Sequence, residues 1–149
     1  EMPEDNGVYF GHSNMVKNYS AVTAACMLMR RDVFEEIGGF NPELAVSFND
    51  IDLCLEIRRR GYRIVYTPYT RLIHHESVSR LDDNEPVRRP RFHGEITYMI
   101  SKWGQTLYED PYLNPNISIL KYDMSPRDPG ENATLEAFRR AFSGFIWNV

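Results

Sequence analysis

The chain has 149 residues, of which 42% are hydrophobic and 26% charged, and its formal net charge is −4. These values are typical of one soluble globular domain with one core, and they give no basic footprint for a nucleic acid or an anionic membrane surface. The sequence contains no apolar run near the ~20 residues needed to span a bilayer, and no signal peptide is recognised.

The first third of the sequence predicts a loop, a strand and a short helix. Residues 1–17 have the turn-forming composition of a loop. Residues 21–29 form a continuous run of small and apolar side chains, which predicts a strand buried on both faces, with helix as the alternative for so alanine-rich a run. Residues 33–37 predict a short helix that Asp32 caps and that Gly38-Gly39 ends.

An amphipathic helix is predicted next. Asn49 or Asp50 is a natural N-cap, and Asp52 in the first turn complements the helix dipole. Arg58 to Arg60 occupy the last turn, and Gly61 ends the helix. Side chains two residues apart on a helix point about 200° apart, so Asp50 and Asp52 are not expected to form one paired acid site.

Beyond this helix the chain again alternates between strand and helix patterns. Strands are predicted at residues 62–68 and 71–77, a charged loop or flap at 77–90, and a helix at 92–103. Such alternation predicts an α/β layer structure, although it supplies few strands.

The domain organisation follows from composition. Residues 1–124 are expected to form the main unit, and residues 125–149 a tail with a short amphipathic helix. Cys26 and Cys54 have apolar neighbours, which predicts two reduced core thiols rather than a disulfide. Trp103 is expected to pack in the core, with a sugar-stacking platform as the alternative.

Several independent motifs coincide between residues 21 and 80. They are the turn Gly38-Gly39-Phe40, the pair Asn49-Asp50, Gly61-Tyr62, the apolar strand Ile64 to Pro68, and His74. Their order and spacing resemble the C-terminal, acceptor-side half of the catalytic domain of family 2 glycosyltransferases, which have the GT-A fold. The resemblance implies the α/β class and, within it, a partial GT-A (nucleotide-diphospho-sugar transferase-like) α/β/α layer.

The resemblance also implies a function. Such enzymes transfer a sugar, here expected to be a hexose-like unit, from a nucleotide-sugar donor to a glycan acceptor hydroxyl with inversion. The expected setting is bacterial cell-surface polysaccharide synthesis, in the cytoplasm or at the inner face of the membrane through a longer parent protein.

The position that matches the family's proposed general base is Asp50. A carboxylate within hydrogen-bond reach of a hydroxyl can take its proton as the new bond forms. Asn49 stands where the family usually has Glu; it cannot act as a base, but it can hold a sugar hydroxyl or orient Asp50. Gly39 and Phe40 are expected to contribute to acceptor binding.

The resemblance also implies a divalent metal, Mg²⁺ or Mn²⁺, that holds the donor diphosphate and takes a histidine near the end of the domain as one ligand. His74 is the expected ligand and His75 the second choice, because alternation along a strand would point the two to opposite faces. Imidazole suits Mn²⁺ better than Mg²⁺, which prefers oxygen. Arg80 is expected to contact the donor diphosphate, with a solvated loop as the alternative.

Asp50-Ile51-Asp52 spells D-x-D, the string that binds the metal in this family. The family's metal motif follows a strand in the nucleotide-binding half, whereas this string opens a helix. Asp52 is therefore expected to cap the helix or to pair with Arg58, Arg63 or Arg80.

The resemblance does not extend to the nucleotide-binding half, which is expected to be missing from this chain. The isolated chain is therefore predicted to be inactive, and an exposed sheet edge could pair with a second copy as a homodimer. A non-catalytic module that binds glycan or protein is the alternative function. A small metal hydrolase using His74, His75, Asp50 and Asp52 is a third hypothesis.

Overall fold

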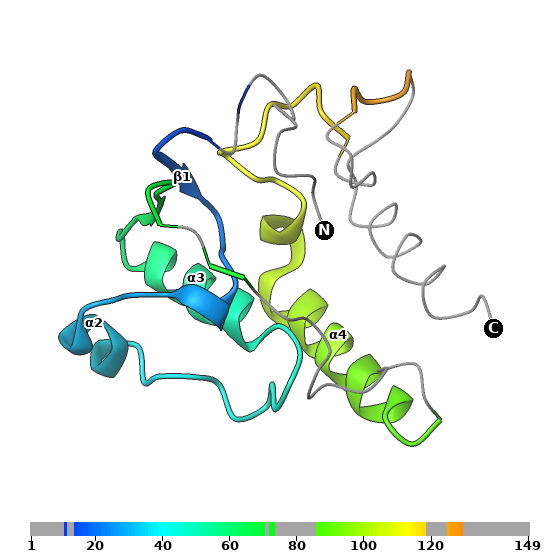
Figure 1. Cartoon of the computed structure of the whole chain (residues 1–149). Helices are drawn as coiled ribbons and strands as arrows, with labels where there is room; N and C mark the ends of the chain where they lie inside the picture. The colour runs from blue at the N-terminus through cyan, green and yellow to red at the C-terminus, as the bar shows by residue number, and fades with distance from the viewer. Residues whose placement is uncertain (1–10, 12–13, 71, 74–85, 119–124, 130–149) are drawn as a thin grey trace.

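Helix α3 (Asn49–Arg59) lies between helix α2 (Arg31–Glu36) and helix α4 (Arg89–Trp103) in the computed structural model (Figure 1). The structure describes residues 11, 14–70, 72–73, 86–118 and 125–129. Helix α3 is the central element of the fold, because one apolar side packs on α2 and the other on α4.

In the part of the chain that the structure describes, the core consists of two clusters that share α3. In the first, Leu53 and Ile57 of α3 pack on Val33 of α2. In the second, Leu55 of α3 packs on Met99 of α4, together with a loop residue, Leu44. All six side chains are at most 7% exposed. Burying a side chain of this size stabilises the fold by roughly 1.5–3 kcal/mol, so the two clusters fix α3 from both sides.

Among the described residues, the sheet has two short antiparallel strands, β1 (Lys17–Tyr19) and β2 (Ile64–Tyr66). Tyr19 pairs with Ile64 in register, and the rings of Tyr19 and Tyr66 meet edge to face with centroids 5.6 Å apart. The strand predicted at 62–68 is confirmed in its centre, whereas β1 begins in the last residue of the predicted loop and was missed. Helices with a small sheet bear out the α/β class.

The predicted strand at residues 21–29 is wrong. The structure has a short 3₁₀ helix there, η2 (Ala24–Cys26), flanked by irregular chain. Cys26 is exposed and Leu28 is 99% exposed, so Cys26 is not a core thiol as predicted. A strand buried on both faces needs neighbours that cover it, and the described residues supply none at this segment. Cys54 is buried and free, as predicted.

The C-terminal ends of the helices match the sequence predictions better than their N-terminal starts do. Gly38 and Gly39 follow α2 with φ of 83° and 75°, and Gly61 follows α3 with φ of 88°, as the predicted stop signals require. The predicted caps are wrong: the N-cap of α2 is Arg30 and that of α3 is Phe48, and neither side chain forms a capping bond. Asp32 instead forms an ion pair with Arg30.

Helix α4 confirms the helix predicted at 92–103 and starts three residues earlier. A 3₁₀ turn, η3 (Gly104–Leu107), follows it. Further on, Ile117 forms an isolated bridge with Pro126. Of the strand predicted at 71–77, Leu72 and Ile73 are described and are not in a strand. The other residues of that strand and the predicted tail helix lie outside the described residues.

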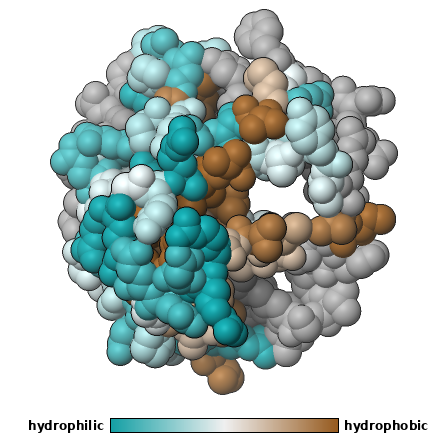
Figure 2. All heavy atoms as spheres, turned by 90° about the vertical axis from the view of Figure 1, so that its left-hand side faces the viewer, coloured by the Kyte–Doolittle hydropathy of each residue, from teal (hydrophilic) through white to brown (hydrophobic). Residues whose placement is uncertain are grey.

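Hydrophobic side chains reach the surface on the face seen in Figure 2, beside a broad polar area. The most exposed large apolar residues in the described part are Leu28, Val87, Tyr69 and Ile73, at 82% or more. Within that same part, no helix has the length and apolar character to cross a membrane.

Candidate functional site

Asp50, the candidate base, lies in the first turn of α3 and faces the segment that contains η2. Its Oδ2 accepts a hydrogen bond from the Ala24 backbone N–H at 3.0 Å, and its Oδ1 accepts one from the Ile51 N–H at 2.9 Å. A carboxylate has about four lone-pair sites, so roughly two remain for a hydroxyl. The Asp50 side chain is therefore oriented by the backbone without being saturated.

The turn into α3 determines where Asp50 sits. Phe48 has φ of 64°, a left-handed conformation that costs an ordinary residue roughly 1–2 kcal/mol. Its ring stacks on Phe92 of α4, with centroids 5.8 Å apart and planes 18° apart, and it packs against the second core cluster. This packing holds the strained backbone immediately before Asn49 and Asp50. The Asn49 side chain is half-buried and forms no hydrogen bond with the described residues.

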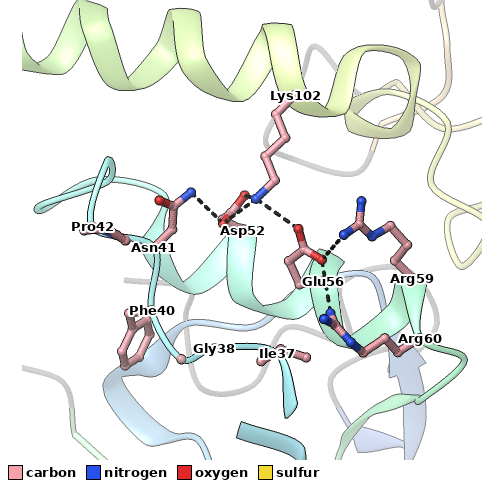
Figure 3. A pocket seen from close by; sticks show the side chains of 11 residues that line it. Ile37, Gly38, Phe40, Asn41, Pro42, Asp52, Glu56, Arg59, Arg60 and Lys102 are labelled. Atoms are coloured by element: carbon pink, nitrogen blue, oxygen red, sulfur yellow. Dashed lines mark hydrogen bonds and ion pairs between the residues drawn. The ribbon is translucent and has the colours of Figure 1, made fainter. Parts of the chain in front are cut away.

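Asp52 lies on the other side of the helix and is only 2% exposed. Its carboxylate accepts bonds from Lys102 Nζ at 2.8 Å and from Asn41 Nδ2 at 3.2 Å (Figure 3). It also accepts one from Trp103 Nε1 at 2.6 Å. The expectation that Asp52 and Asp50 diverge is confirmed. Neither Arg58 nor Arg63 is a partner of Asp52, so these two predictions are wrong, and the third predicted partner, Arg80, lies outside the described residues. With both oxygens already occupied by three donors, the Asp52 carboxylate is a structural anchor and offers no free face to a cation.

The Asp52 bonds tie three segments together. Lys102 and Trp103 belong to the end of α4, and Asn41 belongs to the turn after Gly38-Gly39-Phe40. Asn41 Nδ2 also contacts the Tyr98 hydroxyl at 2.7 Å. Sequence reasoning missed these partners, since nothing in the pattern indicates which residue about 50 positions away supplies a cation.

A polar pocket of about 320 Å³ opens beside this network. Figure 3 shows Lys102 reaching down from α4 to Asp52 and Glu56, while Arg59 and Arg60 point at Glu56. The cations lining the pocket are therefore paired with its two carboxylates. Trp103 is half-buried and packs against the second cluster, as expected for a residue at the edge of the core.

Gly39 and Phe40, the predicted acceptor residues, line this pocket, whereas Asn49 and Asp50 do not. Phe40 is 47% exposed and meets Phe34 edge to face at 5.7 Å. A Cβ on Gly39 would lie 3.1 Å from the Phe34 ring, so only glycine fits this turn comfortably. The structure thus separates the predicted base from the predicted Gly-Phe acceptor turn.

Two groups in this region have shifted acidities. Burial acts to lower the pKa of Lys102, but its hydrogen bonds to Asp52 and Glu56 outweigh this and raise the pKa overall. Burial raises the pKa of the Cys54 thiol, which therefore stays protonated at neutral pH.

The predicted metal ligands His74 and His75 and the predicted diphosphate contact Arg80 lie outside the described residues. Among the residues that are described, no group of three or more His, Cys, Asp or Glu side chains is placed to hold a metal ion. The hydrolase hypothesis gains no support from Asp50 and Asp52, because their carboxylates face different segments.

Comparison with known proteins identifies the family. Residues 11–90 match the family described as "Glycosyltransferase like family 2". Because the match spans more than half of the chain, the chain belongs to this family, and its helices and small sheet are a partial α/β fold of the GT-A type. The resemblance drawn from the sequence motifs is confirmed.

The sequence is also similar to three bacterial proteins. It is 44% identical over 129 residues to "Uncharacterized protein y4gI" of Sinorhizobium fredii, and 37% identical over 134 residues to "O-antigen biosynthesis protein RfbC" of Myxococcus xanthus. It is 28% identical over 78 residues to an "N-acetylglucosaminyl-diphospho-decaprenol L-rhamnosyltransferase" of Mycobacterium tuberculosis.

The matched part is a small share of each relative. The first two matches cover 84% and 87% of this chain but only 14% and 10% of the relatives, and the third covers 52% of this chain and 25% of the relative. No solved structure matches the chain.

Proposed function

We propose that this chain is part of an inverting, metal-dependent glycosyltransferase that moves a hexosyl unit from a nucleotide-sugar to a hydroxyl of a glycan acceptor in cell-surface polysaccharide synthesis. The printed names of two relatives, an O-antigen biosynthesis protein and a rhamnosyltransferase, support the setting. We place the reaction in the cytoplasm, where nucleotide-sugars are the donors.

The observation that carries the proposal is the geometry of Asp50. Two backbone N–H groups orient its carboxylate, and lone pairs remain for an incoming hydroxyl. In the proposed step the acceptor oxygen bonds to the anomeric carbon, the bond from that carbon to the nucleoside diphosphate breaks, and the hydroxyl proton passes to Asp50. A positioned base of this kind contributes roughly 10²–10⁴-fold to a rate.

Asn49 supports acceptor binding in this proposal. Its amide has both donor and acceptor groups and forms no bond with the described residues, so it can contact a sugar hydroxyl next to Asp50. Gly39 and Phe40 line the pocket on the other side of α3, where the ring of Phe40 is available to a more distant part of an acceptor.

The metal is proposed on His74, with His75 as the second choice and Arg80 on the diphosphate. A bound Mn²⁺ or Mg²⁺ would neutralise charge on the departing diphosphate. Asp52 is not assigned to this metal, because Lys102, Trp103 and Asn41 already occupy its oxygens.

The proposal is tested on the longer natural protein that contains this chain. It is incubated with nucleotide-hexoses and a glycan acceptor, and the anomeric configuration of the product is followed by NMR. We expect transfer with inversion that stops when EDTA removes the metal. Retention of configuration, or undiminished transfer in EDTA, would refute the proposed mechanism.

The alternative is a non-catalytic module that binds glycan or protein. Asn49 in the place of the usual Glu favours it. Binding of the glycan acceptor by the longer protein, with no transfer from any nucleotide-hexose, would support this alternative over the enzyme.

A further inference from the structure

A second pocket, of about 440 Å³, lies at the C-terminal end of α3. Its walls come from α3, from the turn that follows Gly61, and from the chain that runs from Trp103 to Tyr112. Arg58 and Asp50 are eight residues apart on the same helix, or about 12 Å along its axis. The pocket is therefore separate from the candidate base.

The charge of this pocket is only partly compensated. Three arginines line it, Arg58, Arg59 and Arg63, and none of the described residues that line it carries a carboxylate. The first pocket differs, since Asp52 and Glu56 there pair with the neighbouring cations (Figure 3). Arg59 is shared by both pockets and bonds to Glu56 at 2.8 Å, so Arg58 and Arg63 supply the available charge.

The Arg58 guanidinium forms no ion pair with the described residues. Its Nη1 is buried and has no hydrogen-bond acceptor in the described part of the chain, and its guanidinium lies 5.3 Å from the centre of the Tyr112 ring. A buried donor without an acceptor is costly, and an anion placed against this guanidinium would offset that cost. Arg63 is exposed and forms no ion pair with any described residue.

Aromatic rings form the rest of the wall. Tyr62 and Tyr112 are each 37% exposed, and Trp103 lies beside them with its indole N–H turned away to Asp52. Flat aromatic faces pack against the C–H face of a pyranose ring, while guanidinium groups bind carboxylate or phosphate in bidentate geometry. Guanidinium groups beside aromatic rings fit a sugar that carries an acidic group better than they fit a bare anion or a neutral sugar.

We propose that this pocket binds an anionic saccharide unit, a sugar ring that carries a carboxylate or a phosphate. Arg58 and Arg63 hold the acidic group, and Tyr112 with Tyr62 packs on the ring. The inference rests on the proposed function for the choice of a glycan ligand, but it is tested by binding alone. Loss of transfer activity and loss of this binding are therefore distinguishable.

The test is calorimetric titration of the 149-residue chain with trigalacturonate and, separately, with glucose 1-phosphate. Maltotriose and inorganic phosphate serve as the neutral and bare-anion probes. We expect saturable binding of at least one charged saccharide, and the tighter of the two identifies the acidic group as carboxylate or phosphate. No binding of either would overturn the proposal, as would equal binding of maltotriose or of inorganic phosphate.

Three variants locate the site. Arg63→Gln should weaken binding about tenfold or more, as expected for a lost charged hydrogen bond. Tyr112→Ala should weaken it about twofold to tenfold. Arg31→Gln is the matched control, because that side chain is 90% exposed and lies on α2. Equal loss in the control, or no loss in Arg63→Gln, would contradict the assignment. Arg63 is exposed and forms no ion pair with the described residues, so its variant is expected to fold normally.

Discussion

Replacing Asp52 by Asn is the most informative test of the fold, because this carboxylate ties α3 to two other segments. The substitution keeps the shape of the side chain but removes its charge. The amide can accept through one oxygen only, and its NH₂ group must face a donor among Lys102, Trp103 and Asn41. The bonds to the oxygen that becomes NH₂ are therefore lost, and the bonds to the remaining oxygen are weakened because it no longer carries charge.

The magnitude follows from the contacts. Hydrogen bonds to a charged group contribute roughly 1.5–3 kcal/mol each, and breaking a buried ion pair costs roughly 3–5 kcal/mol when the other charge is left alone. Lys102 keeps Glu56 as a second partner at 3.0 Å, so the cost should fall below that upper range. We expect about 2–4 kcal/mol of destabilisation, or a fall in Tm of roughly 4–16 °C.

Urea unfolding followed by circular dichroism measures this difference directly. Asp32→Asn is the matched control, since its side chain is 65% exposed and its ion pair with Arg30 lies on the surface. The control should leave the unfolding midpoint unchanged. If Asp52→Asn unfolds at the same urea concentration as wild type, the anchor role assigned to Asp52 is refuted.

The stabilisation that Lys102 contributes to the Asp52 network should be lost at high pH. The folded-state pKa of Lys102 is raised, so its contribution is fully present below the unfolded value of about 10.4 and is lost as pH rises through the folded value. The difference in unfolding free energy between wild type and Lys102→Met should be constant from pH 7 to pH 10 and shrink above it. A difference that persists unchanged at pH 11.5 would contradict this.

Two further predictions follow from local geometry. Gly38→Ala should cost about 1–2 kcal/mol for its left-handed backbone alone, whereas Gly39→Ala should cost more, because its Cβ would also press on the Phe34 ring at 3.1 Å. Urea unfolding of the two variants checks this, and equal costs would show that the ring simply moves. Cys26 should react with a thiol reagent at pH 8 while Cys54 stays protected until unfolding, since Cys54 is buried and its pKa is raised. Mass spectrometry of partly labelled protein distinguishes the two thiols, and equal labelling would contradict the burial of Cys54.

Features encoded by local sequence were predictable. The helix ends at Gly38 and Gly61 require positive φ, which glycine adopts at little cost, and the spacing of apolar residues from 92 to 103 indicates α4 directly. The divergence of Asp50 and Asp52 followed from helical geometry alone. The family resemblance came from several such local motifs in fixed order.

Features that depend on distant contacts were not predictable. The run at 21–29 has the composition of a buried strand, but composition does not reveal whether covering strands are present, and Leu28 is exposed. The three-residue strand β1 is defined only by pairing with β2, which lies 47 residues further along, and its sequence Lys-Asn-Tyr carries no strand pattern. The partners of Asp52 depend on how α4 docks, which no local pattern encodes.

The central claim is that Asp50 is the catalytic base, and the rate of sugar transfer by the longer natural protein with Asp50→Asn tests it most directly. The Asn variant can still accept the Ala24 N–H, so the fold should hold, and urea unfolding confirms this beforehand. We expect kcat to fall by roughly 10²–10⁴-fold while KM for the acceptor changes little. A variant that transfers sugar at the wild-type rate would contradict the assignment of Asp50 as the base.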